Sequence, residues 1–500
     1  MRWNSRCSDA TRPSSSRLSR LPGDPLSDSP PSDSYERPAG QPATAGRAVQ
    51  RPALLTGNLR RTLFVLAMPV LLEQFLSFCV GLYDTLLAGH LGNQQSEPAT
   101  VAVGVGAYVG WLATMLFSLV AAGTTALVAR ARGAGDDNDA NRILNRSFAL
   151  ALVAGLGFLV VIFPLAPYVA RAVASDPEAV AIATRYLRLD AIGLALTSLS
   201  LVGSAALRGC GDMRTPMWIL GAVSVLNVIA STILVHGWGP VPPLGVDGIV
   251  TGTIIARSTG GLAMAAVLAR GKSGLQLQIG EMRVRGASAR RILRIGGPSA
   301  LDGSIMWSGH FVFLTIIGSF GETAMAAHIV GIRVEAITYL PAVAWAAAAA
   351  TMIGQSLGAG DVHRARRAGH EAAIQCGLLG VGLTVLFFVG ARLIYAAMHN
   401  SVDVVAVGAP PFRLAALFQI PLIMGIVYVG GLRGAGDTRT PMLITLFSTY
   451  GLRVPGAYVF GVLLEGGLYG AWIAMCIDML ARGVLAFLRF ARGKWVDVRV

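Results

Sequence analysis

The sequence predicts an all-α integral membrane protein whose twelve transmembrane helices form two six-helix lobes related by internal duplication. Three observations lead to this prediction. Hydrophobic residues make up 54% of the 500 residues and charged residues only 14%, whereas about a quarter of a soluble domain is charged. The mean hydropathy is +0.59, and the apolar runs are long enough to span a bilayer, which takes about 20 helical residues. The chain also repeats parts of itself.

The clearest repeat is LRGCGDMRTPM at Leu207–Met217, which returns as LRGAGDTRTPM at Leu432–Met442 with nine of eleven residues unchanged. A second one, RGAGD from Arg132, returns as LGAGD from Leu357, and both pairs are 225 residues apart. Two repeats in one register indicate a duplicated half. In a strongly apolar chain this arrangement is typical of transporters built from two membrane bundles.

Each half contains six apolar runs. They cover residues 62–91, 100–131, 143–172, 180–208, 215–237 and 245–270, and then 290–319, 324–356, 367–398, 404–433, 440–463 and 466–490. A segment in lipid must satisfy its own backbone hydrogen bonds, so we expect each run to be a helix. The predicted organisation is a disordered cytoplasmic extension at 1–58, rich in Ser and Pro, an amino-terminal lobe at 59–270, a cytoplasmic linker at 271–289 and a carboxyl-terminal lobe at 290–495.

The distribution of Lys and Arg predicts the orientation. The loops around Gln94, Pro242, Gly321 and Glu465 contain neither residue, whereas the alternate loops are rich in Arg. Positively charged loops stay in the cytoplasm, so we expect both termini there, in a multi-pass protein of the plasma membrane, here a bacterial inner membrane. The net charge of +14 is spread over these loops and the tail, which argues against a nucleic-acid partner.

No motif for catalysis is visible. HEAAI at His370 lacks the second His of a zinc-protease helix, and no GxxxxGK[ST] loop is present for ATP. The five cysteines are scattered singly, so the sequence indicates neither a disulfide framework nor a zinc site. We therefore expect no enzyme and no cofactor.

Polar residues inside the predicted spans are the functional candidates, because a charge near the bilayer centre costs about 2.5–3.5 kcal/mol. They are Glu73, Asp84, Asn227, Asp302, His328, Glu335, Arg453 and Asp478. Asp84 lies late in the first span. A buried Asp can exchange a proton, or hold a cation with neighbouring oxygens; the alternative is a structural residue near the membrane interface.

Several stretches together resemble the multidrug and toxic compound extrusion (MATE) family, in its DinF-like branch. They are PVLLEQFLSFCVGLYDTLLAGHLG from Pro69, both repeated loops, PSALDGSIMW from Pro298, MAAHIVGIRVEAITYLP from Met325, and LYGAWIAMCIDMLARG from Leu468. The resemblance implies two six-helix lobes around a V-shaped central cavity. It also implies export of organic, often cationic or amphipathic small molecules by alternating access, driven by inward flow of H⁺ or Na⁺ as the coupling ion.

The resemblance places the coupling site in the amino-terminal lobe, on Asp84, Asn227 and Thr253. Ser231 stands where relatives carry Asp or Asn, so one carboxylate is missing and a cation would bind more weakly. No resident metal is expected, although Na⁺ bound transiently at Asp84 and Asn227 is one possibility.

The carboxyl-terminal lobe offers secondary candidates. Met306 occupies the position of a Glu in another branch of the family, and the acidic residue is instead Asp302, one turn past Pro298, as Glu73 is past Pro69. These two are either hinge or packing residues. Glu335 and Arg453 are predicted to pair between helices, and Asp478 with Arg482 near a cytoplasmic helix end. The cavity candidates are Tyr83, Met306, Trp307, Phe311 and Tyr339.

The repeated loops have a structural interpretation. Thr215 and Thr440 are predicted to cap the following helices, and Asp212 and Asp437 to bind nearby Arg groups.

Two other functions fit the same composition. A flippase for a lipid-linked oligosaccharide or peptidoglycan precursor would need several basic residues in its cavity, and the spans contain few. A non-transporting membrane scaffold would need no intramembrane carboxylates. We expect a monomer in the lipid bilayer.

Overall fold

A computed structural model describes residues 56–89, 96–173, 176–238 and 242–498. Almost all of these residues are helical, and the predicted fold class is confirmed. Residues 1–55 of the predicted extension lie outside the described part of the chain.

The first lobe consists of six long helices that match the six predicted spans. They are α1 (Leu59–Gly89), α2 (Ser96–Gly133), α3 (Asp137–Val173), α4 (Pro177–Gly209), α5 (Arg214–His236) and α6 (Val246–Ala269). A linker containing the short helix η2 (Ile279–Glu281) leads to α7 (Ala287–Gly318), α8 (Glu322–Gly358) and α9 (Val362–Met398), and the chain ends with α14 (Gly467–Ala491).

Two predicted spans of the second lobe are irregular. The first is α10 (Val402–Leu417) followed by α11 (Gln419–Gly434), with a bend of 53° between them. The second runs without a gap through α12 (Arg439–Leu446), η3 (Phe447–Arg453), α13 (Val454–Ala457) and η4 (Tyr458–Leu463), and both η3 and η4 are π-helical. Pro421 and Pro455 lack a backbone N–H, and this favours departures from regular helix.

The described residues contain ten helices that are long and apolar enough to cross a membrane, and the bent α10–α11 pair adds an eleventh. The contiguous segments at 439–463 supply the twelfth predicted span.

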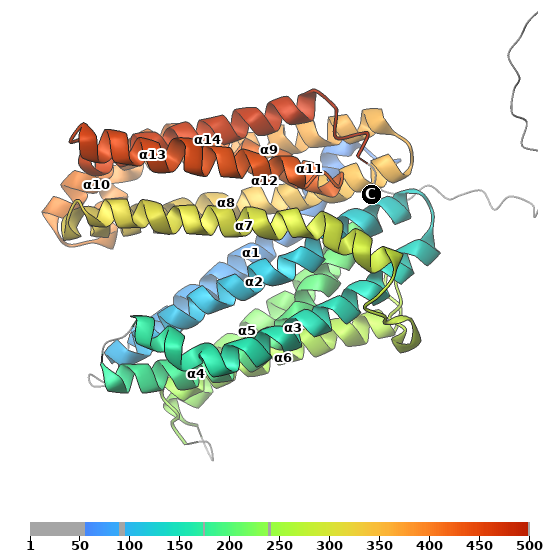
Figure 1. Ribbon diagram of the computed structural model, residues 1–500, viewed down its shortest axis with the longest axis horizontal. Coiled ribbons are helices and arrows are strands. Elements are labelled where there is room, and N and C mark those ends of the chain that lie inside the picture. The colour runs from blue at the N-terminus through green and yellow to red at the C-terminus, as the bar shows by residue number, and fades with distance from the viewer. Residues whose placement is uncertain (1–55, 90–95, 174–175, 239–241, 499–500) are drawn as a thin grey trace, which may run out of the picture. The chain divides into compact units, whose positions relative to one another are not determined.

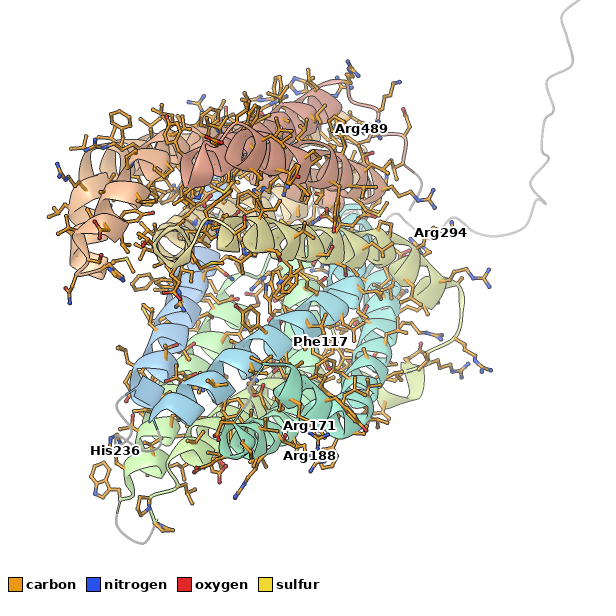
Figure 2. The ribbon with its side chains drawn as sticks, turned by 60° about the vertical axis from the view of Figure 1, so that its left-hand side comes forward. Phe117, Arg171, Arg188, His236, Arg294 and Arg489 are labelled. Atoms are coloured by element: carbon orange, nitrogen blue, oxygen red, sulfur yellow. The ribbon has the colours of Figure 1, made fainter. Side chains whose placement is uncertain are left out.

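The connections α2–α3, α4–α5, α8–α9 and α11–α12 lie at one end of the two lobes, which we call the arginine-rich face (Figure 1). Arg294 and Arg489 lie toward this end, and His236 lies at the other (Figure 2). The two lobes are in contact at the arginine-rich face. Thr351 of α8 donates a hydrogen bond to the carbonyl of Arg208 (2.8 Å), and Gln355 donates one to the carbonyl of Gly209 (2.9 Å).

Helices α2 and α8 cross in close contact, and one glycine from each helix lies at the crossing. A Cβ at Gly133 would collide with the carbonyl of Gln355, and a Cβ at Gly358 would collide with the carbonyl of Arg130. Both partners are related by the same offset of 225 residues. The pseudo-twofold axis of the duplication therefore passes through this crossing, and only glycine permits such close backbone contact.

The first helix of each lobe packs partly against the other lobe. Leu63 and Ala67 of α1 belong to a hydrophobic core with α8, α9, α11 and α14, whereas Ile292 and Ile295 of α7 pack with α2, α3 and α4. At the arginine-rich face, the first part of α1 thus packs in the core of the second lobe, and the first part of α7 packs in the core of the first lobe.

Candidate functional site

A central cavity of about 670 Å³ lies between the lobes. Helices α1, α2, α7 and α8 contribute its walls, in the half of the molecule away from the arginine-rich face. The described lining residues are Ser77, Phe78, Gly81, Leu82, Thr85, Ala88, Thr100, Val103, Gly104, Ala107, Tyr108, Trp111, Trp307, His310 and Arg333. Trp307 crosses between the lobes, with its ring centroid 4.6 Å from that of Trp111 and 5.5 Å from that of Tyr108.

Most of this wall is apolar or aromatic, and its titratable groups among the described residues include Arg333 and His310 but no carboxylate. Such a surface suits bulky aromatic and amphipathic molecules, because apolar contact adapts to many shapes. A negative charge that attracts a cation must therefore come from carboxylates behind the wall.

Asp84 is the nearest such carboxylate along α1, next to the lining residue Thr85. Its side chain is half-buried, and its Oδ1 is buried without a hydrogen-bond partner among the described residues. Arg257 of α6 and Asp190 of α4 lie within electrostatic range of it. An incompletely satisfied carboxylate inside a helix bundle is well suited to take up a proton or a cation.

The other predicted coupling residues tie α5 to α6. Asn227 donates a hydrogen bond from Nδ2 to Thr253 Oγ1 (3.1 Å), and its Oδ1 is buried without a donor among the described residues. Ser231 donates to the carbonyl of Ile249 (3.4 Å). The structure thus brings Asn227 and Thr253 together, whereas the Ser231 hydroxyl faces the backbone of α6.

Sequence reasoning missed an ion pair in this lobe. Arg257 Nη1 lies 2.5 Å from Asp190 Oδ1, and the Asp190 side chain is only 3% exposed. Both residues fall within predicted spans, at 180–208 and 245–270. A complete count of charged residues in the spans would have found them.

The second lobe contains a buried cluster of four charged residues, which we call the α8–α14 charge cluster: Glu335, Arg453, Asp478 and Arg482. Asp478 accepts from Arg453 (2.8 Å) and from Arg482 (3.1 Å). The predicted direct pair of Glu335 with Arg453 is wrong, because the Arg453 guanidinium binds Asp478. The predicted place of Asp478 near a helix end is also wrong, since it lies in the middle of α14.

Glu73 and Asp302 form equivalent ion pairs. Arg208 Nη2 lies 2.5 Å from Glu73 Oε1, and Arg433 Nη2 binds Asp302 Oδ2. Arg208 and Arg433 belong to the repeated loop sequence. Each pair fastens the first helix of a lobe to the end of α4 or α11, one turn past Pro69 or Pro298, so these carboxylates are already neutralised.

In the repeated loops, the Asp side chains cap the following helices, and the prediction that Thr215 and Thr440 cap them is wrong. Asp212 accepts hydrogen bonds from the N–H and hydroxyl of Thr215, and Asp437 accepts them from Thr440. Asp437 also pairs with Arg489 (2.7 Å), as predicted for an Arg partner, whereas Asp212 accepts from Ser273 (2.7 Å) instead. The carboxylates are the caps because their oxygens accept from two donors at once.

Asp212 lies outside the membrane-spanning helices. Burial alone would raise the pKa of its carboxyl group, but hydrogen bonds from Thr215 and Ser273, with the nearby Lys272 charge, outweigh burial and hold this pKa below its usual value.

The remaining cavity candidates lie in different places. Met306 Sδ contacts Arg482 Nη1 (3.2 Å), and the Tyr83 hydroxyl lies 2.5 Å from Thr232 Oγ1. Phe311 lines a separate groove with Tyr458, and Tyr339 is 38% exposed. Trp307 is the member of the predicted set that lines the described central cavity.

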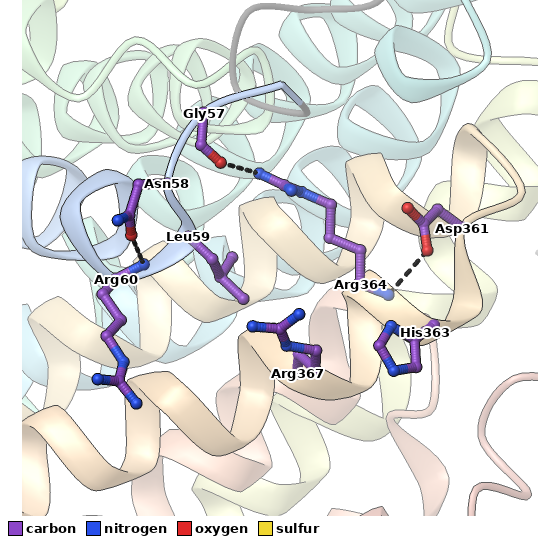
Figure 3. Close-up of a pocket in the computed structure, with 8 residues that line it drawn as sticks. All are labelled: Gly57, Asn58, Leu59, Arg60, Asp361, His363, Arg364 and Arg367. Atoms are coloured by element: carbon purple, nitrogen blue, oxygen red, sulfur yellow. Dashed lines mark hydrogen bonds between the residues drawn. The ribbon is translucent and has the colours of Figure 1, made fainter.

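A separate pocket, which is polar and has a volume of about 510 Å³, lies at the arginine-rich face between the start of α1 and the start of α9 (Figure 3). Arg364 donates there to the carbonyl of Gly57 (3.0 Å), and Arg60 pairs nearby with Glu371 (3.0 Å). These contacts connect the start of α1 to α9, and therefore one lobe to the other, at the end where the repeated loops lie.

A family model described as MatE matches residues 69–233 and 298–459. These stretches begin at Pro69 and Pro298, one in each lobe. A probable multidrug resistance protein NorM from Thermotoga maritima is 30% identical over 439 residues, covering 88% of this chain and 93% of that protein. Multidrug resistance protein PmpM from Pseudomonas aeruginosa is 27% identical over 451 residues, with 86% and 92% coverage.

Two solved structures share the fold. A MOP superfamily transporter from Pyrococcus furiosus aligns with a TM-score of 0.83 and 22% identity, covering 90% of this chain and 99% of that one. An outward-facing multidrug resistance MATE transporter aligns with the same score, identity and coverage. The family match extends over more than half of the residues and both lobes. The chain therefore belongs to the MatE family of multidrug and toxic compound extrusion transporters, which are multi-pass membrane proteins.

Proposed function

We propose that this protein is a secondary active antiporter of the plasma membrane that exports organic compounds in exchange for H⁺ or Na⁺. Its arginine-rich face is cytoplasmic, because that face carries the positively charged loops. Exchange proceeds by alternating access, in which the lobes rock about the contacts of α2 with α8. Neither an enzymatic step nor a resident cofactor is part of the proposal.

The observation that carries the proposal is the position of Asp84. The α1 helix lines the cavity with Gly81, Leu82 and Thr85, and between them it carries a carboxylate whose Oδ1 has no partner among the described residues. A proton or cation bound at Asp84 and a compound bound in the cavity would both contact α1. Occupation of one site can therefore disfavour the other, as antiport requires.

The proposed compounds are cationic or amphipathic and aromatic. Trp111, Trp307 and Tyr108 supply broad ring faces that attract organic cations as well as flat apolar groups. Asp84 supplies long-range attraction behind this wall. Na⁺ would need additional oxygens, and Asn227 Oδ1 and Thr253 Oγ1 on the facing helices are the candidates.

A flippase for a lipid-linked pyrophosphate is the second candidate, and Arg333 with His310 on the cavity wall favours it. Such a cargo, however, is usually held by several guanidinium and ammonium groups. The one arginine among the described lining residues makes organic-compound export the better proposal.

The test is transport of a fluorescent organic cation in inside-out vesicles, with H⁺ and Na⁺ gradients imposed separately. Wild-type protein should accumulate the cation under one gradient, and Asp84→Asn should reduce the rate by more than about tenfold, since the neutral amide cannot exchange charge. Asp247→Asn is the matched control, because that carboxylate already pairs with the exposed Arg185 (2.8 Å). Undiminished transport by a well-inserted Asp84→Asn protein would refute the proposed role.

A further inference from the structure

We propose that Glu335 is a second proton-exchange site, located in the carboxyl-terminal lobe, and that Arg453 moves between Asp478 and Glu335 as the proton is bound and released. The inference rests on the proposed antiport function and adds a site to it. Its ligand is a proton rather than a metal ion.

The first observation is an unsatisfied buried carboxylate. Glu335 is 4% exposed, and its Oε1 is buried without a hydrogen-bond partner among the described residues. Two guanidiniums lie in the same cluster, but Asp478 accepts from both of them, at 2.8 Å and 3.1 Å. An ionised carboxylate in this setting would be expected to draw a guanidinium to itself, because a buried unpaired charge is costly. A neutral, protonated Glu335 needs no guanidinium partner, and the arrangement in which Asp478 holds both guanidiniums fits that state.

The second observation is the repeat. With the offset of 225 residues, Thr253 corresponds to Asp478 and Arg257 to Arg482, while Arg453 follows the residue that corresponds to Asn227. Asp478 and Arg482 thus occupy the positions of Thr253 and Arg257, and Arg453 lies beside the counterpart of Asn227, whereas Glu335 itself corresponds to Gly110. The duplication provides a polar site at this depth in each lobe, although the residues differ.

The third observation is the backbone at Arg453. This residue ends the π-helical stretch η3, and its guanidinium lies 5.6 Å from the centroid of the Phe313 ring. A π-helix has looser hydrogen bonding than an α-helix and often marks a functional position. Small rearrangements of η3 can therefore change the partner of Arg453 without unfolding the span.

The surroundings favour a proton over Na⁺. The titratable and charged groups of this region come from five elements: His310 of α7, His328 and Tyr339 of α8, Tyr395 of α9, Arg453 of η3, and Cys476, Asp478 and Arg482 of α14. Two guanidiniums repel a metal ion, and no group of three or more metal-binding His, Cys, Asp or Glu side chains is present among the described residues.

The cluster is connected to the cavity through α7. Arg482 contacts Met306, and the next residue, Trp307, lines the cavity. With Glu335 ionised the four charges cancel, and with Glu335 protonated they leave one positive charge behind this wall. Proton uptake should therefore weaken binding of an organic cation, and binding of the cation should release the proton.

The test uses the full-length protein in nanodiscs and needs no transport. Protons released on binding of the fluorescent cation rhodamine 6G are counted in weakly buffered solution, and difference infrared spectra between acid and alkaline pH record protonated carboxyl groups. Glu335→Gln should release about one proton fewer per bound cation, should lose one carboxyl band, and should bind the cation with less dependence on pH. Glu335→Asp should restore these signals.

Unchanged proton release and infrared bands in Glu335→Gln would overturn the inference. If this variant is unstable, wild-type protein and Asp478→Asn provide the infrared comparison, and absence of any titrating band that shifts in Asp478→Asn would overturn it as well. Failure of the proposed function is distinguishable, because Asp84→Asn would then transport normally whatever Glu335 does. The Asp84→Asn background also isolates the Glu335 signal, since one of the two carboxyl groups is removed.

Discussion

The two lobes have kept the same backbone contacts but not the same polar interior. At the arginine-rich face, the pairs Glu73–Arg208 and Asp302–Arg433 are equivalent, as are the glycine contacts of α2 and α8. In the interior, the first lobe places a carboxylate on α1, whereas Phe313 stands at the equivalent place after Pro298 and lies under Arg453. The shared contacts preserve the common motion, and the different interiors allow the lobes to bind different charges.

The same difference applies to the fifth and sixth spans of each lobe. A neutral hydrogen bond joins Asn227 to Thr253 in the first lobe, while a buried ion pair joins Arg453 to Asp478 in the second. A neutral pair is inexpensive to break, whereas breaking a buried ion pair leaves an unpaired charge. The second lobe should therefore be more sensitive to substitution.

The largest expected effect follows from that contrast. Arg453→Met should lower the free energy of unfolding by about 3–5 kcal/mol, because it removes one of the two guanidiniums that pair with the buried Asp478 carboxylate. Asn227→Ala, its counterpart in the first lobe, should cost only about 1–2 kcal/mol. Thermal unfolding in detergent measures both, and equal losses would show that the interiors do not differ in this way.

The shared crossing gives the next prediction. Gly133→Val and Gly358→Val should each reduce transport strongly, since the added side chain collides with the opposite backbone. Symmetry predicts similar losses for the two variants. Gly157→Val on α3 is the control, because Gly157 has open space around it. Gly81→Val would not serve, because Gly81 lines the cavity. A normal rate in either crossing variant would contradict the symmetric contact.

The paired carboxylates Glu73 and Asp302, one turn past Pro69 and Pro298, should behave alike. Glu73→Gln and Asp302→Asn each remove one charge from a buried pair and should each lower stability by about 1–3 kcal/mol. Stability of the two variants is compared by thermal unfolding at neutral pH. A loss confined to one lobe would indicate that the pairs are not equivalent despite their geometry.

The departure at Ser231 sharpens the comparison of ion sites. Ser231→Asp adds a carboxylate near Asn227 and Thr253, and it should introduce or strengthen a rise of the melting temperature with Na⁺, since ligand binding stabilises the folded state. KCl at equal ionic strength is the control. An unchanged melting temperature across the Na⁺ titration would argue against a cation site on these helices.

The smallest effect concerns the loop cap at Asp212. Its depressed pKa means that the ionised carboxylate stabilises the folded state above the usual Asp pKa, and that this contribution is lost as pH falls through the folded pKa. Asp212→Ala should therefore cost about 1 kcal/mol at neutral pH and progressively less in strong acid. A cost that stays constant as the pH falls would contradict this account.

Much of the fold could be predicted from the sequence because lipid enforces a simple rule. Apolar runs such as 62–91 and 143–172 must be helices, and the repeated loop fixed their register between the lobes. The π-helical stretches at 447–453 and 458–463 were not predictable, since no residue pattern distinguishes this span from an α-helix containing Pro455. The partners of Arg453 depend on that local backbone, which explains why the predicted pair with Glu335 was wrong.

The candidate site was only partly accessible to sequence reasoning. Asp84 and Asn227 were identified as polar residues inside apolar spans and Thr253 through resemblance, and the hydrogen bond between Asn227 and Thr253 is observed. Asp190 and Arg257 were overlooked although each lies in an apolar span. Whether a charged residue faces the cavity or a partner depends on helix rotation, and composition does not contain that information.

The most direct test of the central claim is ion movement driven by the organic compound itself. Sealed vesicles containing wild-type protein are given a gradient of a fluorescent cation, and internal pH and Na⁺ are followed with indicator dyes. The account predicts opposing movement of H⁺ or Na⁺ with the wild type and with Asp247→Asn, and movement slowed by more than about tenfold with Asp84→Asn. Ion movement at the wild-type rate in a folded Asp84→Asn protein would contradict the assignment of Asp84 as the coupling carboxylate.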